Sequence, residues 1–215
     1  MAANLKSLAK DTAIYGLSSI VGRFLNYLLV PLYTASLSAA SGGYGVITNV
    51  YSYTALLLVI LTYGMETTFF RFANKTDENP HTVYTTTLVA VGATSLAFVA
   101  AVLGFLPWVA GAMGYADHPN YIGVMAAVVA LDAFQAIPFA YLRYKKRPIK
   151  FAALKLLFIF LNIALNLLYF LVLPALYKTH PGAVGAIYDP TVGVGYAFYL
   201  NLVCTGVITF FFWRE

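Results

Sequence analysis

An arginine lies near the middle of an apolar stretch, residues 12–34, and is the residue of this chain best placed to do chemistry. Asn26 follows Arg23 at helical spacing, and the stretch is long enough to cross a bilayer, which takes about 20 residues. A guanidinium at mid-bilayer depth is costly if it faces lipid. We therefore expect Arg23 and Asn26 to line a polar cavity. The alternative is that Arg23 only forms a structural ion pair with an acid on another helix.

A carboxylate in a second apolar stretch has two interpretations. Asp132 lies near the middle of residues 121–144, one turn before Gln135 and on the same face of the expected helix. It is the best candidate for a structural partner of Arg23. It is equally a candidate, together with Gln135, for a proton or Na⁺ site, because ionisable groups inside a membrane commonly mark ion pathways.

A polar stripe follows one face of a third apolar stretch. Asn162, Asn166 and Tyr169 continue the face of Lys155 at spacings of seven, four and three residues. Lys155 is close enough to the end of its helix for its long side chain to reach the lipid headgroups. Buried asparagines commonly join helices to one another. Because a lysine heads the stripe, we expect it to form a cavity wall.

A few other polar residues complete the candidates. We expect Asn49, Tyr53 and Asn201 to contribute to the same cavity. Glu66 and Arg71 lie near one end of the second apolar stretch, five residues apart, where an ion pair would meet the membrane interface. For these two we expect a structural ion pair.

The sequence gives no sign of an enzyme. It contains no G-x-S-x-G elbow, no H-E-x-x-H and no cysteine pair with zinc spacing. His81, His118 and His180 fall in expected loops on opposite sides of the membrane, so they cannot converge on one metal. Cys204 is the single cysteine, which excludes a disulfide framework. We therefore expect no catalytic residue, no metal and no cofactor beyond a coupling ion.

The composition is that of an integral membrane protein. Hydrophobic residues make up 61% of the chain and charged residues 10%, and the mean hydropathy is +0.78. No soluble domain buries so large an apolar fraction. We expect an all-α protein, a single transmembrane lobe over residues 1–215. Its six spans are expected at about 12–34, 44–72, 83–106, 121–144, 149–173 and 192–213.

Two of these spans carry features that predict how they pack. The third has a stripe of small residues, Ala93, Ala97, Ala101 and Gly104, which predicts a face for close helix packing. The fourth contains Pro138, which is expected to kink it.

The loop charges predict an orientation. Basic residues flank alternate loops and the ends of the chain: Lys6, Lys10, Arg71, Lys75, Arg143, Lys145, Lys146, Arg147, Lys150 and Arg214. The other loops hold only Lys178. By the positive-inside rule both termini and the RYKKRP turn lie in the cytoplasm. Topology accounts for the net charge of +5, so we expect no nucleic-acid partner; a lipid-binding or nucleic-acid-binding patch is the alternative for RYKKRP.

The first two spans resemble a known family. The order is LAKDTAIYG, then GRFLNYLLVPLYT, then a small-residue loop ending in YGVI, then a long span ending in LTYGMETTFFRF. This is similar to the start of the polysaccharide and O-antigen flippases of the multidrug/oligosaccharidyl-lipid/polysaccharide superfamily. The resemblance covers about Leu8–Phe72, whereas the later spans agree only in length and orientation. It rests on Gly22-Arg23-Phe24, Pro31-Leu32-Tyr33-Thr34, Tyr44-Gly45, Gly64 and Arg71-Phe72.

The resemblance implies a fold and an activity. The family fold, like that of the multidrug exporters, has two six-helix lobes around a central cavity. Such proteins move lipid-linked saccharides, including lipopolysaccharide precursors, across the bacterial inner membrane by alternating access. Six spans amount to one lobe. We expect a second lobe from a continuation of the chain, with a partner subunit or a second copy as the alternatives.

The resemblance also implies roles for the polar residues. Arg23, with Lys155, is expected to attract the diphosphate of a polyprenyl-diphosphate sugar, and the asparagines of the fifth span to hydrogen-bond its hydroxyls. Asp132, with Gln135, is expected to exchange the coupling H⁺ or Na⁺. Two alternatives remain: a cation-coupled multidrug exporter of the same superfamily, or a non-transporting scaffold of a saccharide assembly complex in which Arg23 and Asp132 lock the bundle.

Overall fold

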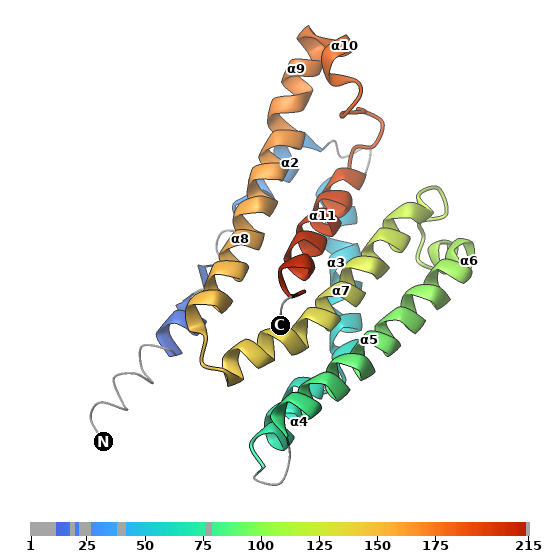
Figure 1. The fold of residues 1–215 in the computed structure, drawn as a ribbon. Helices are drawn as coiled ribbons and strands as arrows, with labels where there is room; N and C mark the ends of the chain where they lie inside the picture. Colours follow the sequence, from blue (N-terminus) through green and yellow to red (C-terminus); the bar gives the residue numbers. More distant parts are fainter. Residues whose placement is uncertain (1–11, 18–19, 22–26, 38–41, 76–78, 214–215) are drawn as a thin grey trace. The chain divides into compact units, whose positions relative to one another are not determined.

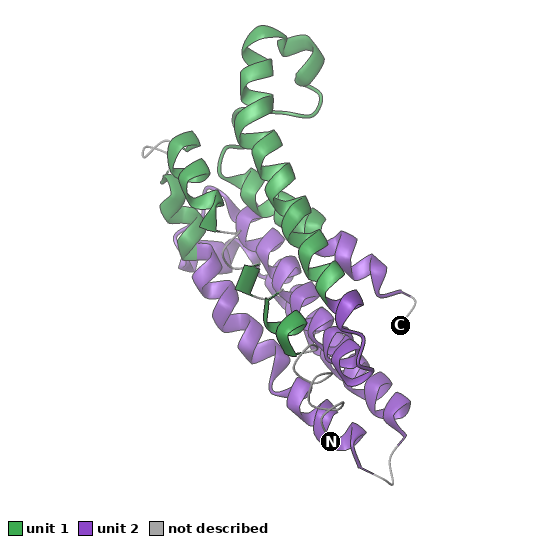
Figure 2. Ribbon diagram, turned by 90° about the vertical axis from the view of Figure 1, so that its left-hand side faces the viewer, with its two compact units in different colours: residues 1–49, 152–204 green, residues 50–151, 205–215 purple. Residues whose placement is uncertain are grey.

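A computed structural model describes residues 12–17, 20–21, 27–37, 42–75 and 79–213, which form helices and no strand (Figure 1). The chain divides into two compact units, and each is described by itself (Figure 2). Unit 1 contains residues 1–49 and 152–204, and unit 2 contains residues 50–151 and 205–215. Three helices, α3, α8 and α11, begin in one unit and end in the other.

Unit 2 is built around long helices. It holds most of α3 (Gly43–Thr62), then α4 (Met65–Ala73), α5 (Pro80–Gly104), α6 (Leu106–Ala112) and α7 (Pro119–Tyr144), and the end of α11 (Gly195–Phe211). Unit 1 holds α2 (Leu29–Ser36), most of α8 (Pro148–Leu167), the π-helix η2 (Leu168–Val172), α9 (Leu173–Thr179) and α10 (Pro181–Val184).

Four helical segments are long and apolar enough to cross a membrane: Gly43–Ala73, Pro80–Gly104, Pro119–Tyr144 and Pro148–Thr179. They occupy the stretches expected for the second to fifth spans. The sixth stretch is represented by α11, a shorter apolar helix. The first stretch lies partly outside the described residues, so the six-helix lobe stays a prediction, while the helical class is confirmed.

The second span is broken, whereas the sequence predicted one long helix. The backbone turns into the left-handed region at Tyr63 (φ 31°) and Gly64 (φ 74°), which ends α3 and starts α4. Glycine adopts this conformation at little steric cost, which explains its presence at the break. The span expected at residues 44–72 is therefore two helices in sequence.

Prolines and a cap fix where the long helices begin. Pro80, Pro119 and Pro148 are the first residues of α5, α7 and α8, a position where the missing N–H costs nothing. The side chain of Asn79 also caps α5 by accepting the backbone N–H of His81 at 2.9 Å.

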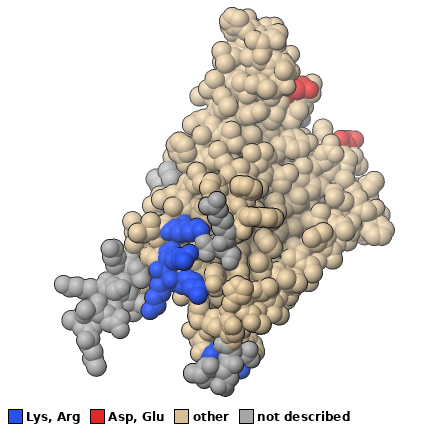
Figure 3. All heavy atoms as spheres, viewed as in Figure 1, with Lys and Arg blue, Asp and Glu red and all other residues tan. Residues whose placement is uncertain are grey.

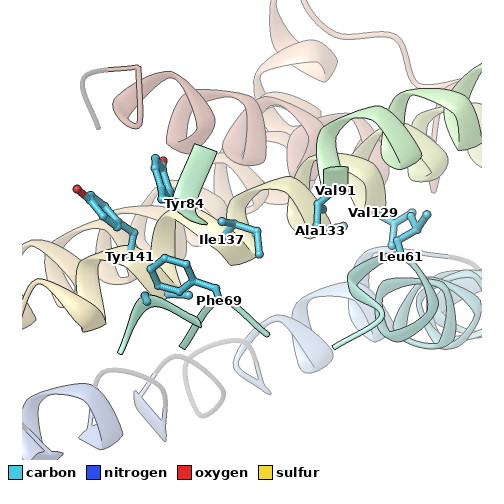
Figure 4. Packing of buried hydrophobic residues seen from close by; sticks show 10 residues of the cluster. Leu61, Phe69, Tyr84, Val91, Val129, Ala133, Ile137 and Tyr141 are labelled. Atoms are coloured by element: carbon cyan, nitrogen blue, oxygen red, sulfur yellow. The ribbon is translucent and has the colours of Figure 1, made fainter. Parts of the chain in front are cut away.

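Aromatic rings form the core of unit 2 where α4, α5 and α7 meet (Figure 4). Tyr84 and Tyr141 stack with ring centroids 4.2 Å apart. Phe69, which is fully buried, meets both rings edge-on at 6.3 Å and 6.2 Å. Edge-on and offset-stacked contacts suit the charge distribution of aromatic rings and contribute about 0.5–1.5 kcal/mol per pair.

The predicted packing face of α5 is wrong. Its small residues, Ala93, Ala97, Ala101 and Gly104, are all exposed, and the buried stripe is Tyr84, Thr87, Val91 and Ser95. The small residues at this contact come from α7 instead, where Ala133 and Ala140 are fully buried in the same cluster as Val91. Close approach needs a small side chain on one helix only, so α5 can offer large ones.

Candidate functional site

A buried hydrogen-bond chain in unit 1 joins α2 to α8. The Tyr33 hydroxyl donates to Asn166 Oδ1 at 2.7 Å. Asn166 Nδ2 in turn donates to the backbone carbonyl of Asn162 at 2.8 Å and to its Oδ1 at 3.0 Å. Asn166 has no exposed surface, and both the oxygen and the nitrogen of its amide group are hydrogen-bonded. A ligand would reach Asn166 only if this chain opened.

Aromatic rings surround the tyrosine at the head of this chain. Tyr44 stacks on Tyr33 at 6.1 Å, and Phe170 meets it edge-on at 5.2 Å. Phe170 belongs to the π-helix η2. A π-helical turn changes the direction of the following side chains, and such turns are common at functional sites. The rings exclude water from the Tyr33–Asn166 bond, which makes that bond more costly to break.

Two of the four residues of the predicted polar stripe, Asn162 and Asn166, are bonded to each other. Asn162 and Asn166 bond directly, as their spacing of four predicts. Lys155, further toward the start of α8, is half-buried and makes interactions of its own. Tyr169 joins a different group of residues, with its ring 4.9 Å from that of Tyr196.

Of the two residues predicted to couple an ion, Asp132 and Gln135, the structure shows Gln135 in bonds that join two helices of unit 2. Gln135 is buried, and its Nε2 donates to the Thr205 carbonyl at 2.9 Å and to the Thr209 hydroxyl at 2.7 Å. The Thr209 hydroxyl donates to the same carbonyl at 2.9 Å. These bonds hold α7 against the end of α11. Asp132, one turn earlier, is half-buried and engaged in interactions of its own.

The remaining predicted site residues are divided between the two units and the part of the chain that the structure does not describe. Arg23 and Asn26 lie outside them. Asn49 is exposed and belongs to unit 1, where Asn201 is buried. Tyr53 is 42% exposed and lines an apolar cavity of about 370 Å³ in unit 2, between α3, α5, α6 and α7. The assignment of these residues to a substrate cavity stays a prediction.

The predicted ion pair between Glu66 and Arg71 is wrong. Glu66 Oε2 instead meets Arg143 Nη2 at 2.5 Å, which joins α4 to α7, and Arg71 is exposed. The guanidinium of Arg143 also lies over the Phe70 ring at 5.4 Å. The Tyr144 hydroxyl adds a bond from α7 to the Ala73 carbonyl at 3.0 Å. Residues five apart on a helix point in different directions, and an acid on α4 finds a partner across the interface more easily.

Basic side chains collect at this same end of unit 2. Figure 3 shows lysines and arginines gathered over the turn between α7 and α8. They are Arg143, Lys145, Lys146, Arg147 and Lys150, and Arg71 and Lys75 at the end of α4 belong to the same end. Lys145 and Lys75 lie over the rings of Tyr141 and Phe72, at 5.3 Å and 4.5 Å. Cations beside aromatic rings are typical of a membrane interface.

Two partners were missed by sequence reasoning, although signals for them exist. Tyr33 falls on the same helical stripe as Arg23, which indicates polar surroundings but does not name Asn166 as its partner. Thr209 follows Thr205 by four residues on α11, a spacing that places both on one face.

The described geometry has long apolar helices, buried amide–hydroxyl bonds between them and a basic end, and comparison with known proteins decides the family. A family described as polysaccharide biosynthesis protein matches residues 37–177, more than half of the chain. The chain belongs to this family. The match confirms the resemblance to polysaccharide flippase-type proteins. No curated protein and no solved structure matches the chain.

The family match extends beyond the residues that suggested it. It includes Tyr44-Gly45, Gly64 and Arg71-Phe72, and continues over α5, α7 and α8, where the resemblance covers only length and orientation. Gly22–Phe24 and Pro31–Thr34 precede it. With its apolar helices, this polysaccharide biosynthesis protein is a membrane protein with a part in polysaccharide synthesis or transport.

Proposed function

We propose that this chain is a lobe of a flippase that moves lipid-linked oligosaccharide or polysaccharide precursors across the cytoplasmic membrane. The observation that carries the proposal is the family match over residues 37–177, which falls on helices long and apolar enough to span a bilayer. A diphosphate sugar cannot enter lipid, so it needs a polar route. Rocking of two lobes about a central cavity would expose that route to each side in turn.

The polar residues divide between this route and its support. Arg23 and Lys155 attract the diphosphate through charge-assisted hydrogen bonds. Asn162 hydrogen-bonds sugar hydroxyls, and Asn166 contributes when its bond to Tyr33 opens. Asn26, Asn49 and Tyr53 complete the cavity wall in this proposal.

Coupling and orientation follow from the charges. Asp132 takes up and releases H⁺ or Na⁺, and Gln135 holds α7 in register with α11 while it does so. The basic end of unit 2 lies in the cytoplasm, because cationic loops are retained on that side. Both ends of the chain are then cytoplasmic, and a second six-helix lobe completes the transporter.

Removal of Arg23 tests the proposal. Arg23→Ala should lower polymer export ten- to a hundredfold, because a hydrogen bond to a charged group is worth about 1.5–3 kcal/mol. Lys155→Ala should lower it as well. The controls are Arg71→Ala and Lys178→Ala, which remove exposed cations outside the proposed cavity. Normal export by Arg23→Ala at a normal membrane level contradicts the assigned role.

A scaffold is the second candidate, and it is favoured by the buried bonds that Asn166 and Gln135 make between helices. A scaffold needs only the attraction between Arg23 and Asp132. Exchange of the two charges, Arg23→Asp with Asp132→Arg, should then restore function, whereas a diphosphate site would not survive it.

A multidrug exporter is distinguished from the flippase by a different experiment. In cells without the protein, lipid-linked sugar should accumulate and drug resistance should stay unchanged if the protein is a flippase.

A further inference from the structure

Four tyrosines in unit 1 form a continuous ladder of rings that the function proposed above does not use. Tyr177 meets Tyr188 edge-on at 5.7 Å, Tyr188 stacks on Tyr196 at 5.5 Å with the planes 12° apart, and Tyr196 lies 4.9 Å from Tyr169. The four come from η2, α9, the segment after α10 and the start of α11. Each of the four residues is half-buried, so none is sealed inside the core.

Hydrogen bonds in the neighbouring loop hold the ladder in place. The backbone N–H of Asp189 donates to the Tyr196 hydroxyl at 2.6 Å. The Asp189 carboxylate accepts the backbone N–H of Thr191 at 2.9 Å and its hydroxyl at 2.7 Å. Tyr188, the residue before Asp189, is thereby fixed between Tyr177 and Tyr196. The rings form a pre-organised surface, and binding to it would cost little ordering entropy.

The ladder includes a residue at the end of a long apolar helical segment. Pro148–Thr179 is one helical segment long enough to cross a membrane. At 1.5 Å per residue, Tyr177 lies roughly 40 Å along it from Pro148, which exceeds the hydrocarbon thickness of about 30 Å. Tyr177, two residues before the end of this segment, therefore lies near a membrane surface.

We propose that the tyrosine ladder is a glycan-binding surface that receives the saccharide at the end of this membrane-spanning segment. The axial C–H groups of a pyranose pack on the face of an aromatic ring, and successive rings in a row suit successive sugars of a chain. The tyrosine hydroxyls and the exposed Asp189 carboxylate supply hydrogen bonds to sugar hydroxyls. This inference rests on the proposed function, since it takes the glycan to be the cargo.

An aromatic belt at the membrane interface is the competing explanation. Belt residues act singly, each with an apolar ring in lipid and a polar atom toward water. In the ladder the rings contact one another, and the Tyr196 hydroxyl accepts a bond from the loop. The two explanations differ in what happens when one ring is replaced by an aliphatic side chain.

Direct binding to the full chain in lipid nanodiscs tests the proposal. The probe is the set of oligosaccharides released by mild acid from the surface polysaccharide of the cell that makes this protein, fluorescently labelled and followed by anisotropy. Tyr188→Leu should weaken binding by about tenfold, the loss of one stacking contact, and Tyr188→Trp should retain it. Tyr177→Leu, which alters only the end of the ladder, is the second variant in case Tyr188→Leu does not fold.

Trp108→Leu is the matched control, because Trp108 is a 75% exposed aromatic residue that is not one of the four rings of the ladder. Its binding should stay at the wild-type level. The proposal is overturned if the wild-type chain does not bind the oligosaccharides, or if the ladder variants bind as well as wild type. A lipid-linked sugar translocation assay on the same samples separates the two claims: translocation without glycan binding rejects the ladder alone, and glycan binding without translocation rejects the flippase alone.

Discussion

The Tyr33 hydroxyl and the Asn166 side chain meet at 2.7 Å, although 133 positions separate them in the chain. The bond brings α2 against the end of α8, and the second half of the Asn166 amide is bonded to Asn162. A buried amide that is hydrogen-bonded at both its oxygen and its nitrogen holds two helices in one register. Movement of α2 relative to α8 therefore requires this bond to break.

Tyr33→Phe should destabilise the protein. The change keeps the ring contacts to Tyr44 and Phe170 and leaves Asn166 Oδ1 buried without its donor. Polar bonds between membrane helices are worth about 0.6 kcal/mol on average and up to about 1.7 kcal/mol. The free energy of unfolding in detergent micelles measures the loss. Tyr27→Phe, at a 73% exposed position, is the control and should be neutral. Equal stability of the two variants contradicts the assigned bond.

Gln135 and Thr209 should behave as a coupled pair. Gln135→Leu removes the bonds to the Thr205 carbonyl and the Thr209 hydroxyl, and Thr209→Val removes only the second. Residues in contact show interaction energies of about 0.5–3 kcal/mol in a double-mutant cycle, and this pair should lie at the lower end. The cycle is measured by unfolding. Thr94→Val is a control, because the Thr94 hydroxyl bonds only its own helix. Strict additivity of Gln135→Leu and Thr209→Val rules out the contact.

The helices and their local bonds could be predicted from sequence because the signals are local. Apolar runs marked the stretches of α3, α5, α7 and α8. The spacing of four between Asn162 and Asn166 predicted that they share a face, and they bond. The donor of Asn166 could not be predicted, since Tyr33 is distant in sequence and only the packing of α2 on η2 brings it close.

The partner of Glu66 shows why nearest opposite charges mislead. Sequence offered Arg71 on the same short helix, and the structure gives Arg143 on α7. The choice depends on the break at Gly64, which sets the direction of α4, and on the point where α7 ends. Neither is a property of the acid or of its neighbours in sequence. The prediction of which face of α5 is buried was wrong for the same reason, because that face is chosen by the side chains that α7 presents.

The Glu66–Arg143 pair should contribute little to stability. Both side chains are more than a third exposed, at 40% and 35%, and exposed pairs contribute about 0.2–1 kcal/mol. Glu66→Ala should therefore lower the free energy of unfolding by less than about 1 kcal/mol, and the effect should shrink with added salt. Glu66→Arg with Arg143→Glu should recover most of the loss from Glu66→Arg alone. Recovery by Arg71→Glu instead would mean that Arg71 is the partner after all.

Asp189 should make the loop beside the tyrosine ladder sensitive to acid. Hydrogen bonds from the backbone N–H and the hydroxyl of Thr191 hold the pKa of the Asp189 carboxyl below its usual 3.8. A carboxyl whose pKa is lowered by folding stabilises the folded loop above its usual pKa, and that contribution is lost as the pH falls through the lowered value. Protection of the Thr191 amide from hydrogen exchange should fall as the pH drops below 3.8 and through the lowered pKa of Asp189.

Thr191→Val removes the hydroxyl donor and keeps the backbone N–H donor, so the Asp189 pKa should move up toward 3.8. The carbon chemical shift of the carboxyl group follows this titration. Thr179→Val is the control, since the Thr179 hydroxyl bonds the Leu176 carbonyl and should leave the titration unchanged. An Asp189 titration that is the same in wild type and Thr191→Val would show that the hydroxyl bond does not hold the carboxylate.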